Sequence, residues 1–208
     1  MVWRLNDSWP IIYWAVIDYY LEPKIPYYSL RRAYDPVLVT FERTADEIFV
    51  WVVNDSPEPI SGKLTVGRRA FNGDTRGTLT AEITVEPGQS KRCLSTTDIG
   101  PVAMRREFLE ASFGGREVSQ LLIGERYLHL PDAKMTAQFM NGQVEIRAGN
   151  FARQVTLTMN GVTGAIFEDN FFDLPPDCTR TIRIIDTAGG EELTVGALNA
   201  SPVVLDVQ

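Results

Sequence analysis

The chain has 208 residues, of which 44% are hydrophobic and 23% are charged. This length suits two small domains or one large one, and the composition, which is close to the globular average, indicates neither disorder nor a membrane protein. The net charge of −7 excludes the basic surface on which nucleic-acid binding depends, so we expect no nucleic-acid partner.

The first 35 residues are unusually aromatic. They hold three of the four tryptophans and most of the tyrosines of the chain. The apolar run from Trp9 to Tyr20 is shorter than the roughly 20 residues of a membrane span. Pro10 and Asp18 also interrupt it, so we expect no membrane partner. Its density of aromatic rings differs from that of a signal peptide, and it is more typical of one element of a larger structure.

A short helix is predicted over Tyr27–Tyr34. Pro26 suits the first helical position, because the backbone N–H that proline lacks has no partner there in any case. Pro36 disfavours a helical conformation in the residue before it, which places the end of the helix near Asp35.

From residue 36 onward, apolar and polar residues alternate as they do in half-buried strands. Residues 79, 81, 83 and 85 are apolar and their neighbours are polar, which predicts a strand with one solvated face. Ile48–Val53 is apolar on both faces, which is typical of a central strand covered on both sides. Turn residues such as Pro87-Gly88 separate these runs. The pattern indicates an all-β sandwich.

A second set of strands is predicted after residue 132. Met135–Met140 and Gln143–Ala148 flank Asn141-Gly142, which is the strongest short-range signal for a β-hairpin. We therefore expect one sandwich over residues 36–129 and another over residues 130–208. Each is close to the roughly 100 residues of an immunoglobulin-like domain.

Residues with catalytic or metal-binding chemistry are scarce. His129 is the single histidine, and neither Cys93 nor Cys178 has a histidine near it in the sequence, which disfavours a nucleophilic triad. The glycine-rich spots lack a phosphate-binding or dinucleotide-binding pattern, so we expect no cofactor. The acidic stretch of residues 168–173 lacks the spacing of a calcium loop, so we expect no metal. We assign no catalytic residue.

The opening residues have the chemistry of a sugar site. Tryptophan rings stack on the apolar face of a pyranose, and Asn and Asp side chains bind hydroxyls. The stretch from Trp3 to Pro10 combines both residue types, and by itself it is only a weak indication of a sugar site. Tryptophans at this density are also typical of a buried core or an interface, and that alternative stays open.

Two separate motifs resemble one enzyme family. Residues 3–10, W-R-L-N-D-S-W-P, precede a helix that carries Tyr-Tyr and Arg-Arg pairs, and this arrangement resembles the end of the catalytic barrel in family 2 glycoside hydrolases of the β-mannosidase branch. Residues 167–176, F-E-D-N-F-F-D-L-P-P, resemble a signature of the C-terminal sandwich of those enzymes. The motifs lie in the family's order, with a sandwich-sized interval between them.

The resemblance implies a fold and a place in a larger enzyme. Residues 1–35 would be the last strand and helix of a (β/α)₈ barrel, followed by two immunoglobulin-like β-sandwich domains. Trp3 would face the sugar, and Asn6, Asp7 and Trp9 would lie in the next loop, so the resemblance makes these four the expected substrate-binding residues. The retaining mechanism of the family uses two glutamates about 5–5.5 Å apart on earlier barrel strands, so no residue of this chain would be catalytic. The acidic stretch would be a structural corner.

These expectations lead to one function and two alternatives. The chain would be the non-catalytic C-terminal part of a retaining exo-glycosidase that hydrolyses terminal β-linked sugars, and β-D-mannosides are the favoured substrates. Its partner would be a β-linked oligosaccharide or glycoside, bound through the parent enzyme. The first alternative is that it ends a related exo-β-glucosaminidase or β-galactosidase. A stand-alone carbohydrate-binding or adhesion module is the alternative of another class. The sequence leaves the cellular location unassigned.

The aromatic start of the chain also predicts an interface. Exposed apolar surface of this extent tends to acquire a partner. We therefore expect residues 1–35 either to fold back on the first sandwich or to be covered by a second copy of the chain in a homo-oligomer.

Overall fold

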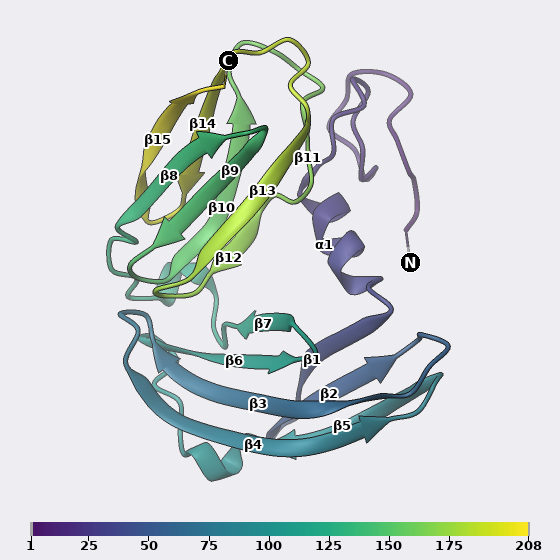
Figure 1. The fold of residues 1–208 in the computed structure, drawn as a ribbon, viewed down its shortest axis with the longest axis vertical. Helices are drawn as coiled ribbons and strands as arrows, with labels where there is room; N and C mark the ends of the chain where they lie inside the picture. The colour runs from purple at the N-terminus through teal and green to yellow at the C-terminus, as the bar shows by residue number, and fades with distance from the viewer. Residues whose placement is uncertain (1, 208) are drawn as a thin grey trace. The chain divides into compact units, whose positions relative to one another are not determined.

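The computed structural model describes residues 2–207 and divides the chain into two compact units (Figure 1). Tyr34–Leu130 form the first unit. The second unit joins the start of the chain, Met1–Ala33, to its end, Pro131–Gln208. Each unit contains one β-sandwich, as the alternating apolar pattern predicts, and we call them the first sandwich and the C-terminal sandwich.

The first sandwich consists of two antiparallel sheets. One has the strand order β1-β2-β5, with β1 at Val37–Arg43, β2 at Ile48–Asn54 and β5 at Gln89–Ser95. The other has the order β4-β3-β6-β7, with β3 at Ile60–Ala70, β4 at Thr75–Val85, β6 at Glu107–Phe113 and β7 at Arg116–Gln120. Two short 3₁₀ turns, η1 at Thr97–Ile99 and η2 at Glu125–Tyr127, lie in the connections.

Strand β2 is central in its sheet, but its cover differs from the expected one. Val50 and Val52 are fully buried in the sandwich core. On the outer face, Phe49 and Trp51 are only half-buried, and the guanidinium of Arg92 lies over their rings at 4.2 and 5.2 Å. The expectation of a protein layer on both sides of β2 is therefore wrong for the outer face. A cation–π contact with Arg92 shields that face instead.

The C-terminal sandwich also has two antiparallel sheets. One has the order β11-β13-β9-β8, with β8 at Met135–Met140, β9 at Gln143–Ala148, β11 at Ile166–Phe167 and β13 at Thr179–Asp186. The other has the order β12-β10-β14-β15, with β10 at Ala152–Met159, β12 at Phe172–Leu174, β14 at Glu192–Ala197 and β15 at Ala200–Asp206. The predicted hairpin is confirmed between β8 and β9: Asn141 and Gly142 have φ values of 53° and 75°, as a type I′ turn requires.

Residues 2–24 form a loop, and the predicted helix follows it as α1, Ile25–Ala33. The resemblance implied a barrel strand at the start of this segment, but the structure has only isolated bridges, from Asn6 to Ile17 and from Ile17 to Pro23. A parallel barrel strand needs hydrogen bonds to a strand on each side, and the described residues supply no such neighbours here. No helix within residues 2–207 has the length and apolar character of a membrane span.

The start of the chain packs with the C-terminal sandwich, so the expectation that it folds back on the first sandwich is wrong. Figure 1 shows α1 beside the part of the C-terminal sandwich that contains β11 and β13. The reason is chemical: the sandwich offers acceptors for an arginine and an apolar site for a tyrosine of α1, and their geometry is given below.

Candidate functional site

Residues 2–24, which we call the aromatic loop, present three tryptophans to solvent. Trp3, Trp9 and Trp14 are 70%, 67% and 72% exposed, and Asn6 is exposed as well. Exposed indole rings offer the flat apolar faces on which sugar rings stack. The loop thus displays three of the four predicted substrate-binding residues, and adds Trp14 to them.

Asp7, the fourth predicted residue, also belongs to the aromatic loop, but it is buried, with only 2% of its surface exposed. Lys24 Nζ donates to Asp7 Oδ2 at 2.5 Å and to the carbonyl oxygen of Tyr13 at 3.3 Å. The other carboxylate oxygen, Oδ1, is buried without a partner among the described residues. In this conformation the carboxylate holds two parts of the loop together, and its Oδ1 is available to accept a further hydrogen bond.

Backbone hydrogen bonds complete the frame of the loop. The Asp7 N–H donates to the Ile17 carbonyl at 3.1 Å, the Ile17 N–H to Leu5 at 2.9 Å, and the Lys24 N–H to Val16 at 2.9 Å. Lys24 was missed as a site residue by sequence reasoning, because nothing in the local pattern links it to a carboxylate 17 positions earlier. The loop is therefore a closed structure with its polar contacts inside and its tryptophans outside.

Helix α1 meets the C-terminal sandwich at the loop between β11 and β12, residues 169–171, which we call the corner. Arg32 Nη1 donates to Asp169 Oδ1 at 2.5 Å and to the Asn170 carbonyl at 3.1 Å, and Nη2 donates to the Phe171 carbonyl at 3.1 Å. The ring of Tyr28 lies 5.8 Å from that of Phe171, centroid to centroid. The two motifs that carry the family resemblance therefore form one contact.

The corner is fixed from within by Asn170, which is 4% exposed. Its Oδ1 accepts from the N–H groups of Leu157 and Phe171, both at 2.9 Å, and its Nδ2 donates to the Leu157 carbonyl at 2.8 Å. Phe171 has a φ of 54°, a left-handed conformation that side-chain-bearing residues rarely adopt. Arg180 donates to the second oxygen of Asp169. The side chains of Asp169 and Asn170 thus stabilise a structural corner, as the resemblance implies.

Asp173, the second aspartate of the stretch, is also engaged by an arginine. Arg153 Nη1 donates to both oxygens of Asp173, at 2.6 and 2.8 Å, and the Gln154 N–H donates to Oδ1 at 2.9 Å. Charge-assisted hydrogen bonds of this kind are the strong ones in proteins. The Asp173 carboxylate therefore fixes the irregular start of β10, where the pairing with β12 shifts its register between Ala152 and Val155.

Tyr28 anchors α1 through burial, since it is 1% exposed. Burial raises the pKa of its hydroxyl from 10.0 to about 12, although a hydrogen bond with the backbone of Phe167 opposes this shift. The folded unit therefore favours the neutral phenol.

Raising the pH is expected to destabilise the unit that contains Tyr28. Between pH 10 and 12 the unfolded chain loses the Tyr28 proton while the folded chain keeps it, so stability falls by up to ~1.4 kcal/mol per pH unit as the pH rises through this window. Urea unfolding followed at several alkaline pH values measures the slope. Tyr28→Phe is the control, and an equal slope in that variant would contradict the assignment.

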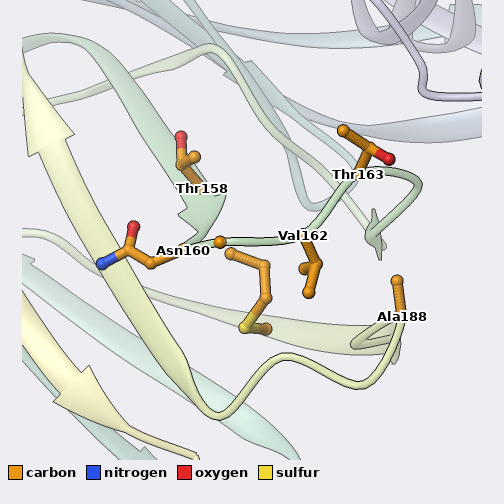
Figure 2. A pocket seen from close by; sticks show the side chains of 7 residues that line it. Thr158, Asn160, Val162, Thr163 and Ala188 are labelled. Atoms are coloured by element: carbon orange, nitrogen blue, oxygen red, sulfur yellow. The ribbon is translucent and has the colours of Figure 1, made fainter.

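The C-terminal sandwich also has an open depression of about 760 Å³. Figure 2 shows it at the end of β10 and the segment that follows, with Ala188 from the connection between β13 and β14 opposite them. It is lined by Thr158, Met159, Asn160, Gly161, Val162, Thr163 and Ala188. It contains no aromatic ring, and Asn160 Nδ2 already donates to Glu192 Oε1 and Thr194 Oγ1. The depression therefore lacks both the stacking surface and the free amide that a sugar site needs.

Two family models match this chain, and both describe mannosidase domains. Residues 46–119 match the family described as a mannosidase Ig/CBM-like domain, and residues 128–206 match the mannosidase family described as an Ig-fold domain. β-Mannosidase B of Aspergillus niger is 36% identical over 77 residues, which are 31% of this chain and 9% of that protein. β-Mannosidase B of Aspergillus terreus is 31% identical over 94 residues, 44% of this chain and 11% of that protein.

Two solved structures share the fold over nearly the whole chain. The β-D-mannosidase from Dictyoglomus thermophilum has a TM-score of 0.80 and 24% identity, with coverage of 96% of this chain and 26% of that one. The exo-chitosanase CsxA from Amycolatopsis orientalis has a TM-score of 0.75 and 16% identity, with coverage of 99% of this chain and 30% of that one. The matched region is less than a third of each relative's length.

The fold and the corner define a protein of tandem immunoglobulin-like β-sandwich domains with an aromatic segment docked on the second domain. Its sandwiches are mannosidase-type immunoglobulin-like domains. Taken together, the chain resembles the C-terminal region of a β-mannosidase-like enzyme.

Proposed function

We propose that this chain serves as the non-catalytic C-terminal part of a retaining exo-glycosidase that removes terminal β-D-mannosyl residues. The aromatic loop would contribute Trp3, Asn6 and Trp9 to the substrate pocket, with Asp7 beneath them. The two sandwiches, over residues 36–129 and 130–208, would brace the loop from outside the barrel. The acid/base and nucleophile glutamates would come from barrel strands of the parent protein.

One observation carries this proposal: the tryptophans of the aromatic loop are exposed although hydrogen bonds hold the loop in place. An ordered loop with its rings outside is suited to contact a ligand or a neighbouring polypeptide. The β-mannosidase relatives support the choice of sugar. The buried Asp7 Oδ1 fits the same view, since a buried carboxylate oxygen without a donor costs free energy until a partner supplies one.

The test compares this chain with the protein encoded by the same reading frame extended upstream. The extended protein is expected to hydrolyse 4-nitrophenyl β-D-mannopyranoside, and this chain alone is expected to show no turnover, because both glutamates are missing from it. The β-D-glucosaminide and β-D-galactoside analogues are assayed in parallel. Faster turnover of either analogue would replace mannose by that sugar, and turnover by this chain alone would overturn the proposal.

The role of the loop is tested in the extended protein. Trp3→Ala and Trp9→Ala are each expected to reduce kcat/KM by about ten- to a hundredfold, because each removes an apolar surface whose burial against the sugar is worth roughly 1.5–3 kcal/mol. The matched control is Tyr127→Ala, an exposed aromatic residue of the first sandwich, which is expected to leave kcat/KM unchanged. Equal losses in all three variants would argue against a sugar-contacting loop.

Binding by this chain alone separates the remaining alternative. A stand-alone carbohydrate-binding or adhesion module would bind mannose oligomers without the barrel, and titration calorimetry measures this directly. We expect no specific binding at millimolar ligand, because the four predicted residues form only one side of a pocket.

A further inference from the structure

The geometry points to a guanidinium receptor in the corner of the C-terminal sandwich, and we propose that this receptor, by holding Arg32, keeps the aromatic loop in its folded position. The proposal does not depend on any sugar or enzyme activity. It concerns how the two ends of the chain become one cooperative unit with the whole first sandwich inserted between them in the sequence.

The first argument is the match between acceptors and ligand. Asp169 Oδ1 and the carbonyl oxygens of Asn170 and Phe171 all face the guanidinium of Arg32, at 2.5, 3.1 and 3.1 Å. An arginine presents several N–H donors in a fixed planar fork, whereas a lysine is a point charge. Three acceptors spread over both terminal nitrogens therefore select a guanidinium.

The second argument is that the acceptors are in place independently of Arg32. The Asn170 amide is bound to both backbone groups of Leu157, which fixes the peptide that carries one acceptor. Phe171 is held in a left-handed conformation, which aims its carbonyl at the same point. Arg180 engages the other oxygen of Asp169 and lies 4.1 Å from the centre of the Phe172 ring. The corner is thus preorganised by contacts inside the C-terminal sandwich.

The third argument connects the receptor to the loop. Helix α1 begins at Ile25, directly after Lys24, whose side chain pairs with Asp7. The helix is only nine residues long, and a helix of this length is marginal without tertiary contacts. Tyr28 and Arg32 are its contacts with the corner. If they are lost, α1 and the loop that precedes it lose their anchor together.

Chemical rescue tests the receptor directly. Arg32→Ala is expected to speed hydrogen exchange of the α1 amides and of the Asp7 and Ile17 amides by about ten- to a hundredfold. Exchange in strands β3 and β6 of the first sandwich is expected to stay unchanged. Ethylguanidinium chloride at low-millimolar concentration, well below a denaturing level, is expected to restore slow exchange, because it replaces the deleted group. Ethylammonium chloride at equal ionic strength is expected to have no effect.

Two variants guard the interpretation. Arg31→Ala removes the same charge from an exposed neighbour on α1 and is expected to leave exchange at wild-type rates. Arg32→Lys keeps the charge without the fork and is expected to fall between wild type and Arg32→Ala. If Arg32→Ala fails to fold, Arg32→Lys takes its place in the exchange experiment. Rescue by both cations alike, rescue by neither, or wild-type exchange in Arg32→Ala would each overturn the proposal.

Discussion

Replacing Asn170 with alanine is expected to destabilise the C-terminal unit by about 3–5 kcal/mol, the largest effect of any single substitution considered for this fold. The change removes the partners of both Leu157 backbone groups and of the Phe171 N–H. A buried polar group without a partner costs about 1–3 kcal/mol.

The measurement is hydrogen exchange followed by mass spectrometry at increasing urea concentrations, which resolves β10 and β13 from strands of the first sandwich. Strands β10 and β13 are expected to open at lower urea in Asn170→Ala, whereas β3 and β6 keep their midpoint. Asn160→Ala is the matched control in the same sandwich: its side-chain amide is half-buried and binds an exposed glutamate and a half-buried threonine, and its expected cost is under ~1 kcal/mol. Equal shifts for the two variants would contradict the special role of Asn170.

The second large effect is expected from Lys24→Met, which removes the positive charge beside Asp7. The carboxylate would then be 2% exposed and lack the single charged partner that the structure gives it. Breaking a buried ion pair by removing one partner costs about 3–5 kcal/mol, although the partial exposure of Lys24 places the expected value at the lower end. This cost is comparable with the free energy of local opening of a surface loop, so the aromatic loop is expected to lose its fixed structure.

Exchange at the Asp7 and Ile17 amides reports this loss, since both N–H groups are hydrogen-bonded within the loop. The double variant Asp7→Asn/Lys24→Met removes the unpaired charge and is expected to recover most of the protection. Lys63→Met, on an exposed position of β3, is the control for the loss of one lysine charge. Protection that persists in Lys24→Met and matches that of Lys63→Met would show that the pair contributes nothing.

These substitutions separate two layers of support beneath the exposed tryptophans. The Asp7–Lys24 pair holds the loop closed on itself. The Arg32 contact with the corner holds the helix that follows it. A loop that contacts a ligand has to keep its side chains in place before binding, because ordering them afterwards costs affinity. Both layers are therefore expected to matter more for the proposed pocket than for the stability of the sandwich strands.

Much of the fold could be predicted because the responsible signals are local. Alternation with period two identified β4 from residues 79–85, and Asn141-Gly142 identified the β8–β9 hairpin, since each pattern depends only on neighbouring side chains and allowed φ values. Pro26 and Pro36 placed the helix to within two residues of its observed start. The two motifs led to the mannosidase-like family through residues that now prove to touch each other.

The tertiary structure alone decided which distant groups meet. Arg32 lies 137 positions from Asp169, and Lys24 lies 17 positions from Asp7; no periodicity links either pair, because ion pairs depend on how the chain is folded in space. The docking of α1 on the C-terminal sandwich and the shielding of β2 by Arg92 are decided in the same way. The sequence by itself determined the strands, the hairpin and the aromatic surface. Tertiary packing determined the contacts that hold the aromatic surface in place, namely the Asp7–Lys24 pair and the Arg32 contact with the corner. Burial and charge pairing depend on the fold of the whole chain, so no local pattern predicts them.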